Sequence, residues 1–311
     1  MVYNNEIKSI AIFGATGHIA KNLICLFSKN TKHKLFLFSR NHSHLKKFIS
    51  TMSVDDNIFY CDYETFQSYS FDVIINCVGI SNPSEILNRR NEILILSEKY
   101  DGIAINYLKN NPFCQYLNFS SGVVYGDFSK PPNDDFSPNF SLLDISNNPY
   151  ALAKINSETK HRSLSSLNII DIRIFSFFSR FIDLNTDFFI SKIIESINNK
   201  KEFVTTKQNF FRDFIHPSDL FQLICLLLDK PASNFAIDVY SKSPISKYEI
   251  LKEFNTHFDL KYSFKDDLTM DHPTGFKEKY FSLSRKAENL GYVPTFSSLE
   301  TLLSESQFLI N

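Results

Sequence analysis

Short apolar runs alternate with helical patterns through the first half of the chain. The runs that predict strands lie at residues 8–13, 34–38, 58–62, 71–79, 114–126 (with the turn that ends it) and 167–175. Helical patterns follow the first run, occupy residues 92–110, and cover the segment that contains Tyr150 and Lys154. This alternation predicts an α/β fold, with a doubly wound parallel sheet of the Rossmann type and right-handed crossovers.

The composition is that of a soluble globular protein. The 311 residues are 43% hydrophobic and 22% charged, with net charge -1, which argues against nucleic acid or an acidic membrane as partner. No apolar run approaches the ~20 residues of a membrane span, and the polar N-terminus predicts no signal peptide. The five cysteines are widely spaced, with no C-x-x-C. Reduced core thiols and a cytoplasmic location are therefore expected.

Glycine is scarce, which makes its positions informative. The chain has 8 glycines, where average usage would give roughly 22. Half of them, Gly14, Gly17, Gly122 and Gly126, fall in two motifs that carry candidate chemistry. A chain this poor in glycine is expected to keep it mainly where a side chain cannot be tolerated.

The first glycine motif, G-A-T-G-H-I-A at residues 14–20, lies between a predicted strand and a predicted helix. Gly14 permits a tight turn, Gly17 lets the backbone approach a pyrophosphate, and the small Ala20 lets the helix pack closely on the strand. The helix N-terminus adds amides and the positive end of the helix dipole. This context favours dinucleotide binding over a plain turn between strand and helix.

The end of the second strand indicates which dinucleotide is bound. An NAD site usually has a carboxylate there to bind the ribose hydroxyls, but this chain has Ser39 and Arg40. Ser39 can donate to a 2′-phosphate, and Arg40 can pair with that phosphate while lying over the adenine. NADP is therefore favoured over NAD. His42 and His44 lack the further ligands of a metal site and are expected in an exposed loop, so no metal is predicted.

Two later strand ends carry small or hydroxyl residues. The fourth predicted strand ends in C-V-G at residues 77–79, and the fifth exits through S-S-G-V-V-Y-G at residues 120–126. Because the carboxyl ends of parallel strands carry the chemistry in such sheets, residues 77–79 are expected beneath the ribose of the cofactor. The two serines are expected beside the crevice.

A tyrosine and a lysine lie four residues apart in N-P-Y-A-L-A-K, residues 148–154. In a helix, Tyr150 and Lys154 share one face. An ammonium near a phenol lowers the phenol pKa from roughly 10 towards neutral pH, and such a pair can pass a proton to or from a carbonyl or hydroxyl. Since Y-x-x-x-K is frequent by chance, its significance depends on the motifs around it.

Together the motifs resemble the extended short-chain dehydrogenase/reductase family, specifically its nucleotide-sugar epimerase, dehydratase and reductase branch. The resemblance covers nearly the whole chain. Besides the motifs above, it depends on Asp62 after the third strand, on P-Y-A-L-A-K-I-N-S-E, on F-R-D-F-I-H-P-S-D-L at residues 211–220, and on L-G-Y-V-P-T-F-S-S-L-E near the C-terminus. Each motif is weak alone, and their order and spacing make the set specific.

The resemblance implies a role for each motif residue. Tyr150 would be the acid/base, Lys154 would lower its pKa and hold the nicotinamide ribose, and Ser121 would hydrogen-bond the sugar oxygen on which charge develops. Arg212 would pair with the diphosphate of a nucleotide sugar. The residues expected to bind the cofactor are Gly14, Thr16, Gly17, His18, Ile19, Ser39, Arg40, Asp62, Cys77, Val78, Gly79, Tyr150 and Lys154. The residues expected to contact the substrate are Ser121, Gly122, Ser176, Phe177 and Arg212.

The resemblance also implies two lobes and a dimer. Residues 1–176, with 210–234 returning to them, would form the NAD(P)-binding Rossmann domain. Residues 177–209 and 235–311 would form a smaller substrate-binding lobe that closes over the crevice. Family members commonly pair two helices from each subunit, so a homodimer is expected.

Three departures from the family pattern narrow the expected activity. The dehydratases of this branch follow the catalytic hydroxyl with an Asp-Glu pair, where this chain has Gly122 and Val123, which argues against dehydration. The asparagine often found in the helix before the fifth strand has no clear equivalent, with Asp101 the nearest candidate. Ser176 stands where relatives carry asparagine, so the sugar is not specified.

The expected activity is NADPH-dependent reduction of a 4-keto sugar linked to a nucleoside diphosphate, because Ser39 and Arg40 favour NADPH. The alternative is an NAD-dependent nucleotide-sugar 4-epimerase that uses the same three catalytic residues. A third possibility is a cofactor-binding regulator without catalysis. The presence of Ser121, Tyr150 and Lys154 together argues against it.

Overall fold

Seven parallel strands form the central sheet, in the order β11-β6-β5-β4-β1-β2-β3. The computed structural model describes residues 6–52, 57–126, 128–135, 148–265 and 276–310. The strands of this sheet are β1 (Ser9–Phe13), β2 (Lys34–Phe38), β3 (Ile58–Cys61), β4 (Val73–Asn76), β5 (Gln115–Ser121), β6 (Ile169–Ile174) and β11 (Asn234–Asp238). This order confirms the predicted Rossmann-type sheet.

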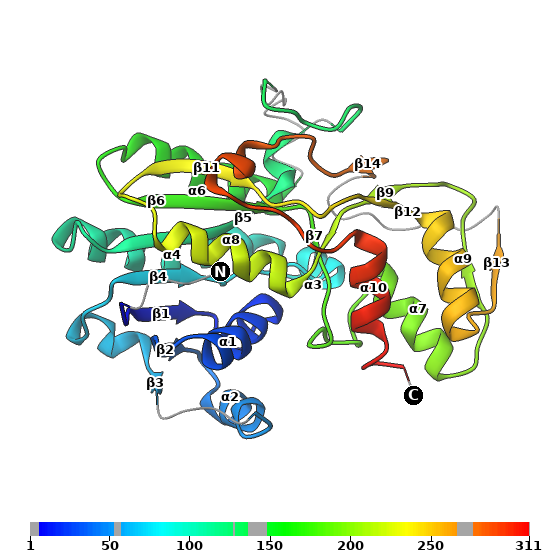
Figure 1. Ribbon diagram of the computed structural model, residues 1–311, viewed down its shortest axis with the longest axis horizontal. Coiled ribbons are helices and arrows are strands. Elements are labelled where there is room, and N and C mark those ends of the chain that lie inside the picture. Colours follow the sequence, from blue (N-terminus) through cyan, green and yellow to red (C-terminus); the bar gives the residue numbers. More distant parts are fainter. Residues whose placement is uncertain (1–5, 53–56, 127, 136–147, 266–275, 311) are drawn as a thin grey trace.

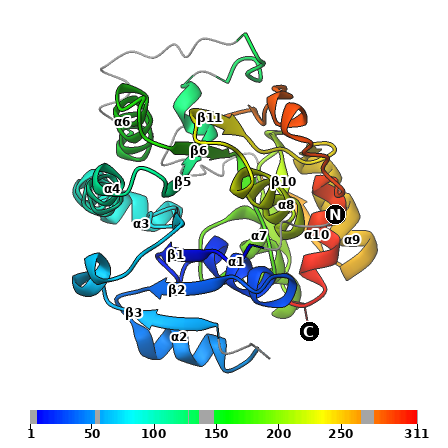
Figure 2. The same ribbon diagram turned by 60° about the vertical axis from the view of Figure 1, so that its left-hand side comes forward.

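Helices cover both faces of the sheet, as Figures 1 and 2 show. Helices α1 (His18–Asn30) and α8 (Pro217–Leu228) lie on one face, and α4 (Ile93–Asn110) and α6 (Pro149–Ser163) lie on the other. Shorter helices are α2 (His42–Ile49) and α3 (Pro83–Asn88), with 3-10 turns η1 (Tyr63–Ser68), η2 (Arg90–Glu92), η3 (Gly122–Tyr125) and η4 (Lys286–Leu290). Because both faces are covered, β1, β4 and β5 are almost wholly buried, and this is why they occur as apolar runs in the sequence.

The fourth predicted strand ends earlier in the structure, and side chains turn the chain at the ends of both the fourth and the fifth strand. In β4 the side-chain oxygen of Asn76 accepts a hydrogen bond from the amide of Val78 at 3.0 Å, which turns the chain away from the sheet. After β5 the side chain of Ser121 accepts from the amide of Val123 at 3.4 Å, and η3 begins. Both turns bring candidate site residues to the carboxyl edge of the sheet.

The predicted domain boundary at residue 235 is wrong for one strand. Residues 234–238 form β11, which pairs in parallel with β6 and completes the large sheet. The prediction assigned most of this strand to the smaller lobe. Its pattern, N-F-A-I-D, is too short and too polar at both ends to be recognised without its neighbour. The prediction also assigned residues 211–212 to the large domain, whereas they form β9, which pairs with β12 (Ile245–Ser246) and β14 (Lys279–Tyr280) of the smaller lobe.

The smaller lobe lies to the right in Figure 1 and has its own hydrophobic core. Its helices are α7 (Phe189–Asn198), α9 (Lys247–Phe258) and α10 (Ser298–Ser306), and its short strands are β8 (Phe203–Thr205), β9 (Phe211–Arg212), β12 (Ile245–Ser246), β13 (Tyr262–Phe264) and β14 (Lys279–Tyr280). Two further short strands, β7 (Ser176–Phe177) and β10 (Phe214–Ile215), pair in parallel. Capping boxes start α9 and α10, each with a serine and a glutamate three residues later.

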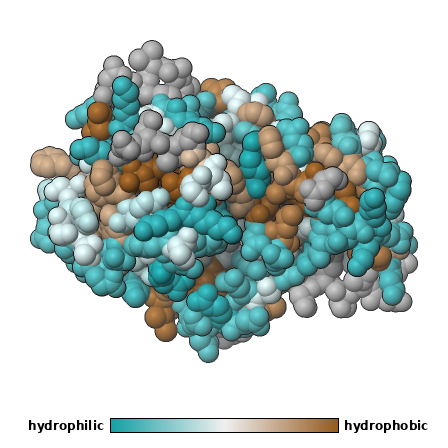
Figure 3. All heavy atoms as spheres, turned by 90° about the horizontal axis from the view of Figure 1, so that it is seen from below, coloured by the Kyte–Doolittle hydropathy of each residue, from teal (hydrophilic) through white to brown (hydrophobic). Residues whose placement is uncertain are grey.

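The surface in Figure 3 is mostly hydrophilic, and its hydrophobic side chains gather in separate patches. Within the ranges given above, no helix has both the length and the apolar character that crossing a membrane requires.

Candidate active site

The glycine turn between β1 and α1 has the geometry of a dinucleotide-binding loop. Gly14 has φ +66°, a conformation that side-chain-bearing residues rarely adopt, and a Cβ there would lie 3.1 Å from the amide nitrogen of Val78. A Cβ on Gly17 would lie 3.1 Å from the carbonyl oxygen of Gly14. No side chain caps the N-terminus of α1 and its first turn has no acidic residue, so its amides are suited to an anion.

The other motif residues of this turn have distinct contacts. Thr16 lies within the turn, and Ile19 packs against the large core. The Nε2 atom of His18 is 2.8 Å from the hydroxyl of Ser179. Burial lowers the pKa of His18 to about 4, so its ring is neutral at pH 7 and adds no charge to the turn.

The end of β2 carries a buried hydroxyl. Among the residues that the structure describes, the Oγ atom of Ser39 has no hydrogen-bond partner, whereas Arg40 beside it is exposed. Asp62, at the end of β3, is 3.3 Å from Nε2 of His42, a contact that the sequence did not indicate. The glycine turn and the unpaired Ser39 together fit the pyrophosphate and ribose ends of a dinucleotide.

The exit of β4 borders both the glycine turn and Lys154. Val78 contacts the position that a Gly14 side chain would occupy, and a Cβ on Gly79 would be 3.9 Å from Nζ of Lys154. Cys77, between these residues and β4, is partly buried, and burial raises the pKa of its thiol. Residues 77–79 therefore lie between the pyrophosphate end of the site and the candidate catalytic helix.

Helix α6 presents Tyr150 and Lys154 because of how it begins. Pro149 occupies the first helical turn, and the side chain of Asn148 accepts a hydrogen bond from the amide of Ala151 at 3.0 Å. Nζ of Lys154 lies 5.9 Å from the ring centre of Tyr150 and donates to the carbonyl oxygen of Phe119 at 2.6 Å. The predicted helical face is therefore present.

The direction of the pKa shift on Tyr150 differs from the prediction. Burial raises the pKa of Tyr150 above its ordinary value, and the hydrogen bond with Ser121 opposes this to a smaller extent. Burial also lowers the pKa of Lys154, against the raising effects of Asp171, Glu158 and Asp101. In this structure the ammonium is directed at a backbone carbonyl, so the phenol gains less from it than sequence spacing suggested.

Tyr280, which the sequence analysis missed, lies at the candidate catalytic centre. Its phenol oxygen is 2.8 Å from Oγ of Ser121, and burial raises its pKa. Tyr280 belongs to β14, more than a hundred residues from Ser121 along the chain, and no local pattern marked it.

Two cations gather beside Tyr280. The guanidinium of Arg212 lies 4.4 Å from the ring centre of Phe210 and 5.7 Å from that of Tyr280. Nζ of Lys277 lies 5.6 Å from the ring centre of Tyr280. Burial lowers the pKa of Arg212 to about 10, while burial and the nearby Arg212 lower that of Lys277 to about 8. Such neighbouring cations suit an anionic ligand.

No carboxylate pairs with Arg212 in the part of the chain that the structure describes. Its NH1 atom donates to the carbonyl oxygens of Phe211 and Lys277, at 2.7 and 2.9 Å. These two bonds fix the direction of the guanidinium. By contrast, the neighbouring Asp213 accepts hydrogen bonds from Ser241 and Ser298, which hold this segment in place.

The remaining residues that were predicted to contact the substrate come just after β5 and β6. Ser176 and Phe177 form β7 next to β10, and both are partly buried. Gly122 packs so closely on Phe175 that an added Cβ would overlap its ring. The aromatic group Tyr125, Phe128 and Phe175 packs together here, with Tyr280 against it.

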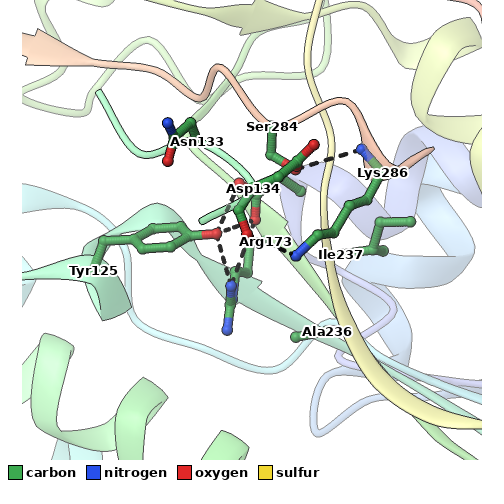
Figure 4. A pocket seen from close by; sticks show the side chains of 9 residues that line it. Tyr125, Asn133, Asp134, Arg173, Ala236, Ile237, Ser284 and Lys286 are labelled. Carbon is green, nitrogen blue, oxygen red and sulfur yellow. Dashed lines mark hydrogen bonds and ion pairs between the residues drawn. The ribbon is translucent and has the colours of Figure 1, made fainter. Parts of the chain in front are cut away.

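A separate cavity of about 150 Å³ lies beside this aromatic group. Tyr125, Arg173, Asp238 and Lys286 are among the residues that line it. Figure 4 shows that polar groups in its lining bond one another, among them Tyr125 with Arg173 and Lys286 with the backbone carbonyl of Asp134. The phenol of Tyr125 is 2.8 Å from NH1 of Arg173 and 2.9 Å from Asp238. Ser121, Tyr150 and Lys154 do not line this cavity, and its paired groups tie β6, β11 and the C-terminal segment together.

No group of three or more His, Cys, Asp or Glu side chains suited to a metal ion occurs among the described residues. The site thus combines a dinucleotide-binding turn with serine, tyrosine and lysine side chains at the carboxyl edge of the sheet. This combination defines an NAD(P)-dependent enzyme of the oxidoreductase or epimerase type.

Comparison with known proteins identifies the family. Residues 10–241 match the model of the NAD dependent epimerase/dehydratase family. The chain belongs to this family, whose model covers most of its length, and the predicted resemblance is confirmed. No curated protein sequence matches the chain significantly.

Solved structures share the fold at low sequence identity. UDP-glucuronic acid 4-epimerase from Bacillus cereus, in complex with UDP-glucuronic acid and NAD, has TM-score 0.81 and 16% identity, covering 97% of this chain and 98% of its own. UDP-glucose 4-epimerase from Thermotoga maritima has TM-score 0.80 and 14% identity, covering 96% and 98%. dTDP-glucose 4,6-dehydratase from Bacillus anthracis, in complex with NAD, has TM-score 0.78 and 14% identity, covering 97% and 96%.

Proposed function

We propose that this protein uses NADPH to reduce a 4-keto sugar linked to a nucleoside diphosphate. The observation that carries the choice of cofactor is the end of β2, where Arg40 is exposed and the buried hydroxyl of Ser39 has no partner within the described part of the chain. A serine and an arginine can pair with a 2′-phosphate, and no carboxylate stands at these two positions to repel it. A net reductase draws on exchangeable NADPH, so the cofactor preference favours reduction.

The candidate catalytic groups can complete this reduction. When bound, the nicotinamide supplies the hydride that the carbonyl carbon accepts. Tyr150 then donates its phenolic proton to the carbonyl oxygen, which yields the alcohol. Ser121 hydrogen-bonds the same oxygen as charge develops on it, and the ammonium of Lys154 stabilises the phenolate that remains. The raised pKa of Tyr150 suits a group that must hold its proton until the reaction.

Arg212 and Lys277 are proposed to bind the diphosphate of the substrate. Both are cationic side chains beside Tyr280, whose hydroxyl contacts Ser121. A diphosphate there would extend from the catalytic serine towards the smaller lobe. Its negative charge would also restore the pKa of both cations towards their ordinary values, because opposite charge favours the ionised form.

Dehydration is not proposed, for a steric as well as a chemical reason. To act as a dehydratase of this branch, the protein would need an acidic side chain at the position of Gly122. An added Cβ there would overlap the ring of Phe175, so no acidic side chain fits without displacing that ring.

The second candidate is a nucleotide-sugar 4-epimerase. The observation that favours it is the set of similar structures, which includes two 4-epimerases, one of them in complex with NAD. Epimerisation would use the same three residues, with one retained cofactor that is reduced and then reoxidised on the enzyme.

Cofactor binding separates the two candidates. The test titrates purified protein with NADPH and with NADH, follows the fluorescence of each, and analyses any nucleotide that copurifies. The reductase predicts exchangeable NADPH and a clear preference over NADH. Tightly retained NAD would reject the reductase in favour of the epimerase, and binding of neither nucleotide would reject both.

A substitution at Ser39 tests the cofactor preference directly, and the same substitution at Ser50 is its matched control. Ser39→Asp places a carboxylate where a 2′-phosphate would bind, so NADPH affinity should fall at least about tenfold while NADH affinity holds or rises. Ser50→Asp adds the same charge at an exposed position after α2 and should leave both affinities unchanged.

A homodimer through α4 and α6 stays a prediction. Ile95 on α4 is 70% exposed, which suits a helix face that packs on a second copy. Light scattering of the protein and of Ile95→Glu checks it. A dimer that the variant converts to a monomer is expected, and a monomeric parent protein would contradict it.

A further inference from the structure

A row of polar side chains crosses the buried centre of the sheet. Asn76 in β4, Asn118 in β5 and Asp171 in β6 are register partners on adjacent strands. Each is at most 5% exposed. Nδ2 of Asn118 donates to Oδ1 of Asp171 at 2.7 Å. Polar residues in the middle of a sheet covered on both faces are costly unless paired, so this row requires partners.

His161 on α6 joins the row to the neighbouring helix α4. Its Nε2 atom is 2.7 Å from Oδ1 of Asp101, and its Nδ1 atom is 2.9 Å from Oδ1 of Asp171. All three side chains are almost completely buried. A ring with a carboxylate at each nitrogen must donate from both, so His161 is an imidazolium here. Burial alone would lower its pKa, but the hydrogen bonds to Asp101 and Asp171 raise it to about 9.

From Asp101 a chain of hydrogen bonds runs to the edge of the candidate cofactor site. The phenol of Tyr116 donates to Oδ1 of Asp101 at 2.9 Å and accepts from Nδ2 of Asn76 at 2.8 Å. Oδ1 of Asn76 accepts from the amide of Val78 at 3.0 Å. Val78 in turn contacts the glycine turn at Gly14.

His161 lies two helical turns beyond Lys154 on α6. Lys154 approaches Gly79, which directly follows Val78. The hydrogen-bond chain and the Lys154 contact therefore connect α6 to the same three-residue loop, 77–79, by two routes.

We propose that His161 is a positioning residue, which through Asp101, Tyr116 and Asn76 fixes the loop 77–79 against Lys154 and the glycine turn. The role of this loop in holding a cofactor rests on the proposed function, whereas the hydrogen-bond chain does not. The phenol of Tyr116 is the nearer acceptor for the amide group of Asn76, at 2.8 Å, while Oδ1 of Asn118 lies at 3.4 Å. The phenol therefore fixes the orientation in which the oxygen of Asn76 faces Val78.

The charged and titratable groups around His161 come from four elements. Asp101 lies on α4 and Asp171 on β6, and the phenol of Tyr116 on β5 bonds the same oxygen of Asp101. On α6 itself, Nζ of Lys160 is 2.5 Å from Oδ2 of Asp101, and NH2 of Arg162 is 2.9 Å from Oδ2 of Asp171. Each carboxylate thus contacts a second cation besides His161. Lys160 and Arg162 are partly exposed, whereas His161 is completely buried.

The test compares two tyrosines with matched surroundings. Tyr116→Phe removes only the hydroxyl that links Asp101 to Asn76. Tyr107→Phe, on α4, removes an equally buried hydroxyl that accepts from the amide of Phe71 at 2.8 Å and lies outside the chain. Hydrogen exchange at the amide of Val78 is measured in both variants and in His161→Gln, together with NADPH affinity.

Exchange of the Val78 amide hydrogen should accelerate about tenfold in Tyr116→Phe. The side chain of Asn76, which accepts the hydrogen bond of this amide, loses the phenol that orients it. His161→Gln should do the same, and both should bind NADPH several-fold more weakly. Tyr107→Phe should accelerate exchange at Phe71 and leave Val78 unchanged.

Two results would overturn the proposal. One is unchanged exchange at Val78 in Tyr116→Phe, which remains decisive even if His161→Gln fails to fold. The other is equal acceleration at Val78 in Tyr107→Phe, which would report a general loss of stability. If the parent protein binds no nicotinamide nucleotide, the proposed function fails, and exchange at Val78 still decides on the hydrogen-bond chain.

Discussion

At the scale of single residues, the candidate site depends on a few hydroxyl groups with strongly buried surroundings. Ser121 contacts both Tyr150 and Tyr280, so its hydroxyl is already hydrogen-bonded before a substrate oxygen arrives. A bound sugar must therefore offer Ser121 a hydrogen bond at least as good as the one from Tyr280. This requirement favours a substrate whose reacting oxygen gains negative charge, as a carbonyl does during reduction.

Tyr150→Phe tests the acid/base role directly. Removal of the phenolic proton should lower turnover by roughly 10²- to 10⁴-fold, while affinity for NADPH stays within about twofold because the ring and Lys154 remain. Steady-state assays on a 4-keto nucleotide sugar, with a parallel NADPH titration, measure both. Tyr262→Phe, in the smaller lobe, is the control and should retain full turnover. Equal activity of the Tyr150 variant would reject the assignment.

Gly122→Ala tests the packing of the turn after β5. The added Cβ would overlap the ring of Phe175, so the free energy of unfolding should fall by about 1–3 kcal/mol. The second substitution Phe175→Leu opens space and should reduce the penalty of Gly122→Ala. Urea unfolding of the two single variants and the double variant measures this coupling. Strictly additive effects would show that the contact is not the cause.

At the scale of elements, α6 has two functions that depend on different turns. Its first two turns carry Tyr150 and Lys154, and its last turn carries the ion pairs of Lys160, His161 and Arg162 with Asp101 and Asp171. His161 and both carboxylates are buried, so their pairing contributes to specificity of packing at a desolvation cost. The geometry of these pairs fixes α6 against α4 and β6.

The stability of the protein should depend on pH through His161. Its pKa is about 9 in the folded protein against 6.5 ordinarily. Because the folded pKa is raised, the contribution is fully present below about pH 6.5 and is lost as pH rises towards 9. The full effect is on the order of 3 kcal/mol. Urea unfolding at pH 6, 7.5 and 9 should show this decline.

The variant His161→Gln should be less stable at pH 6 and should show a flatter dependence between pH 6 and 9. His257→Gln, at an exposed position on α9, is the control and should follow the parent protein. A parent protein with constant stability between pH 6.5 and 9 would contradict the assignment of an imidazolium.

At the scale of the whole molecule, the candidate site is assembled from both lobes. The large sheet contributes the glycine turn, Ser121 and α6, whereas β9 and β14 of the smaller lobe contribute Arg212 and Tyr280. Neither lobe alone brings Arg212 and Tyr280 together with Ser121. Substrate binding is therefore expected to depend on the contact between lobes, and cofactor binding mainly on the sheet.

Arg212→Gln separates these two binding events. Loss of the cation should weaken binding of a nucleoside diphosphate sugar about tenfold or more, while NADPH affinity stays unchanged. Isothermal titration with each ligand measures the difference. Lys277 has its pKa lowered to about 8, so affinity for the sugar nucleotide should fall as pH rises through 8. In Lys277→Gln that dependence should be lost. Equal weakening of both ligands in Arg212→Gln would reject the proposed division.

The sequence predicted the sheet and most of its strands because their residues are buried on both faces, which leaves a strong apolar signal. It did not find β11, whose five residues depend on β6 for their identity as a strand. It also predicted a fourth strand that continues past Asn76. The hydrogen bond from the amide of Val78 to the side chain of Asn76 ends the strand there, and the apolar pattern does not encode this bond.

For this protein, the sequence by itself determined the alternation of strands and helices that predicts a doubly wound parallel sheet, the glycine turn, and the shared face of Tyr150 and Lys154. Each of these leaves a pattern in residues close together in the chain. The tertiary structure alone decided that Tyr280 meets Ser121, that Lys277 joins Arg212, and that burial raises the pKa of Tyr150. Contacts between distant segments, and the loss of solvent that they cause, leave no periodic pattern in the sequence.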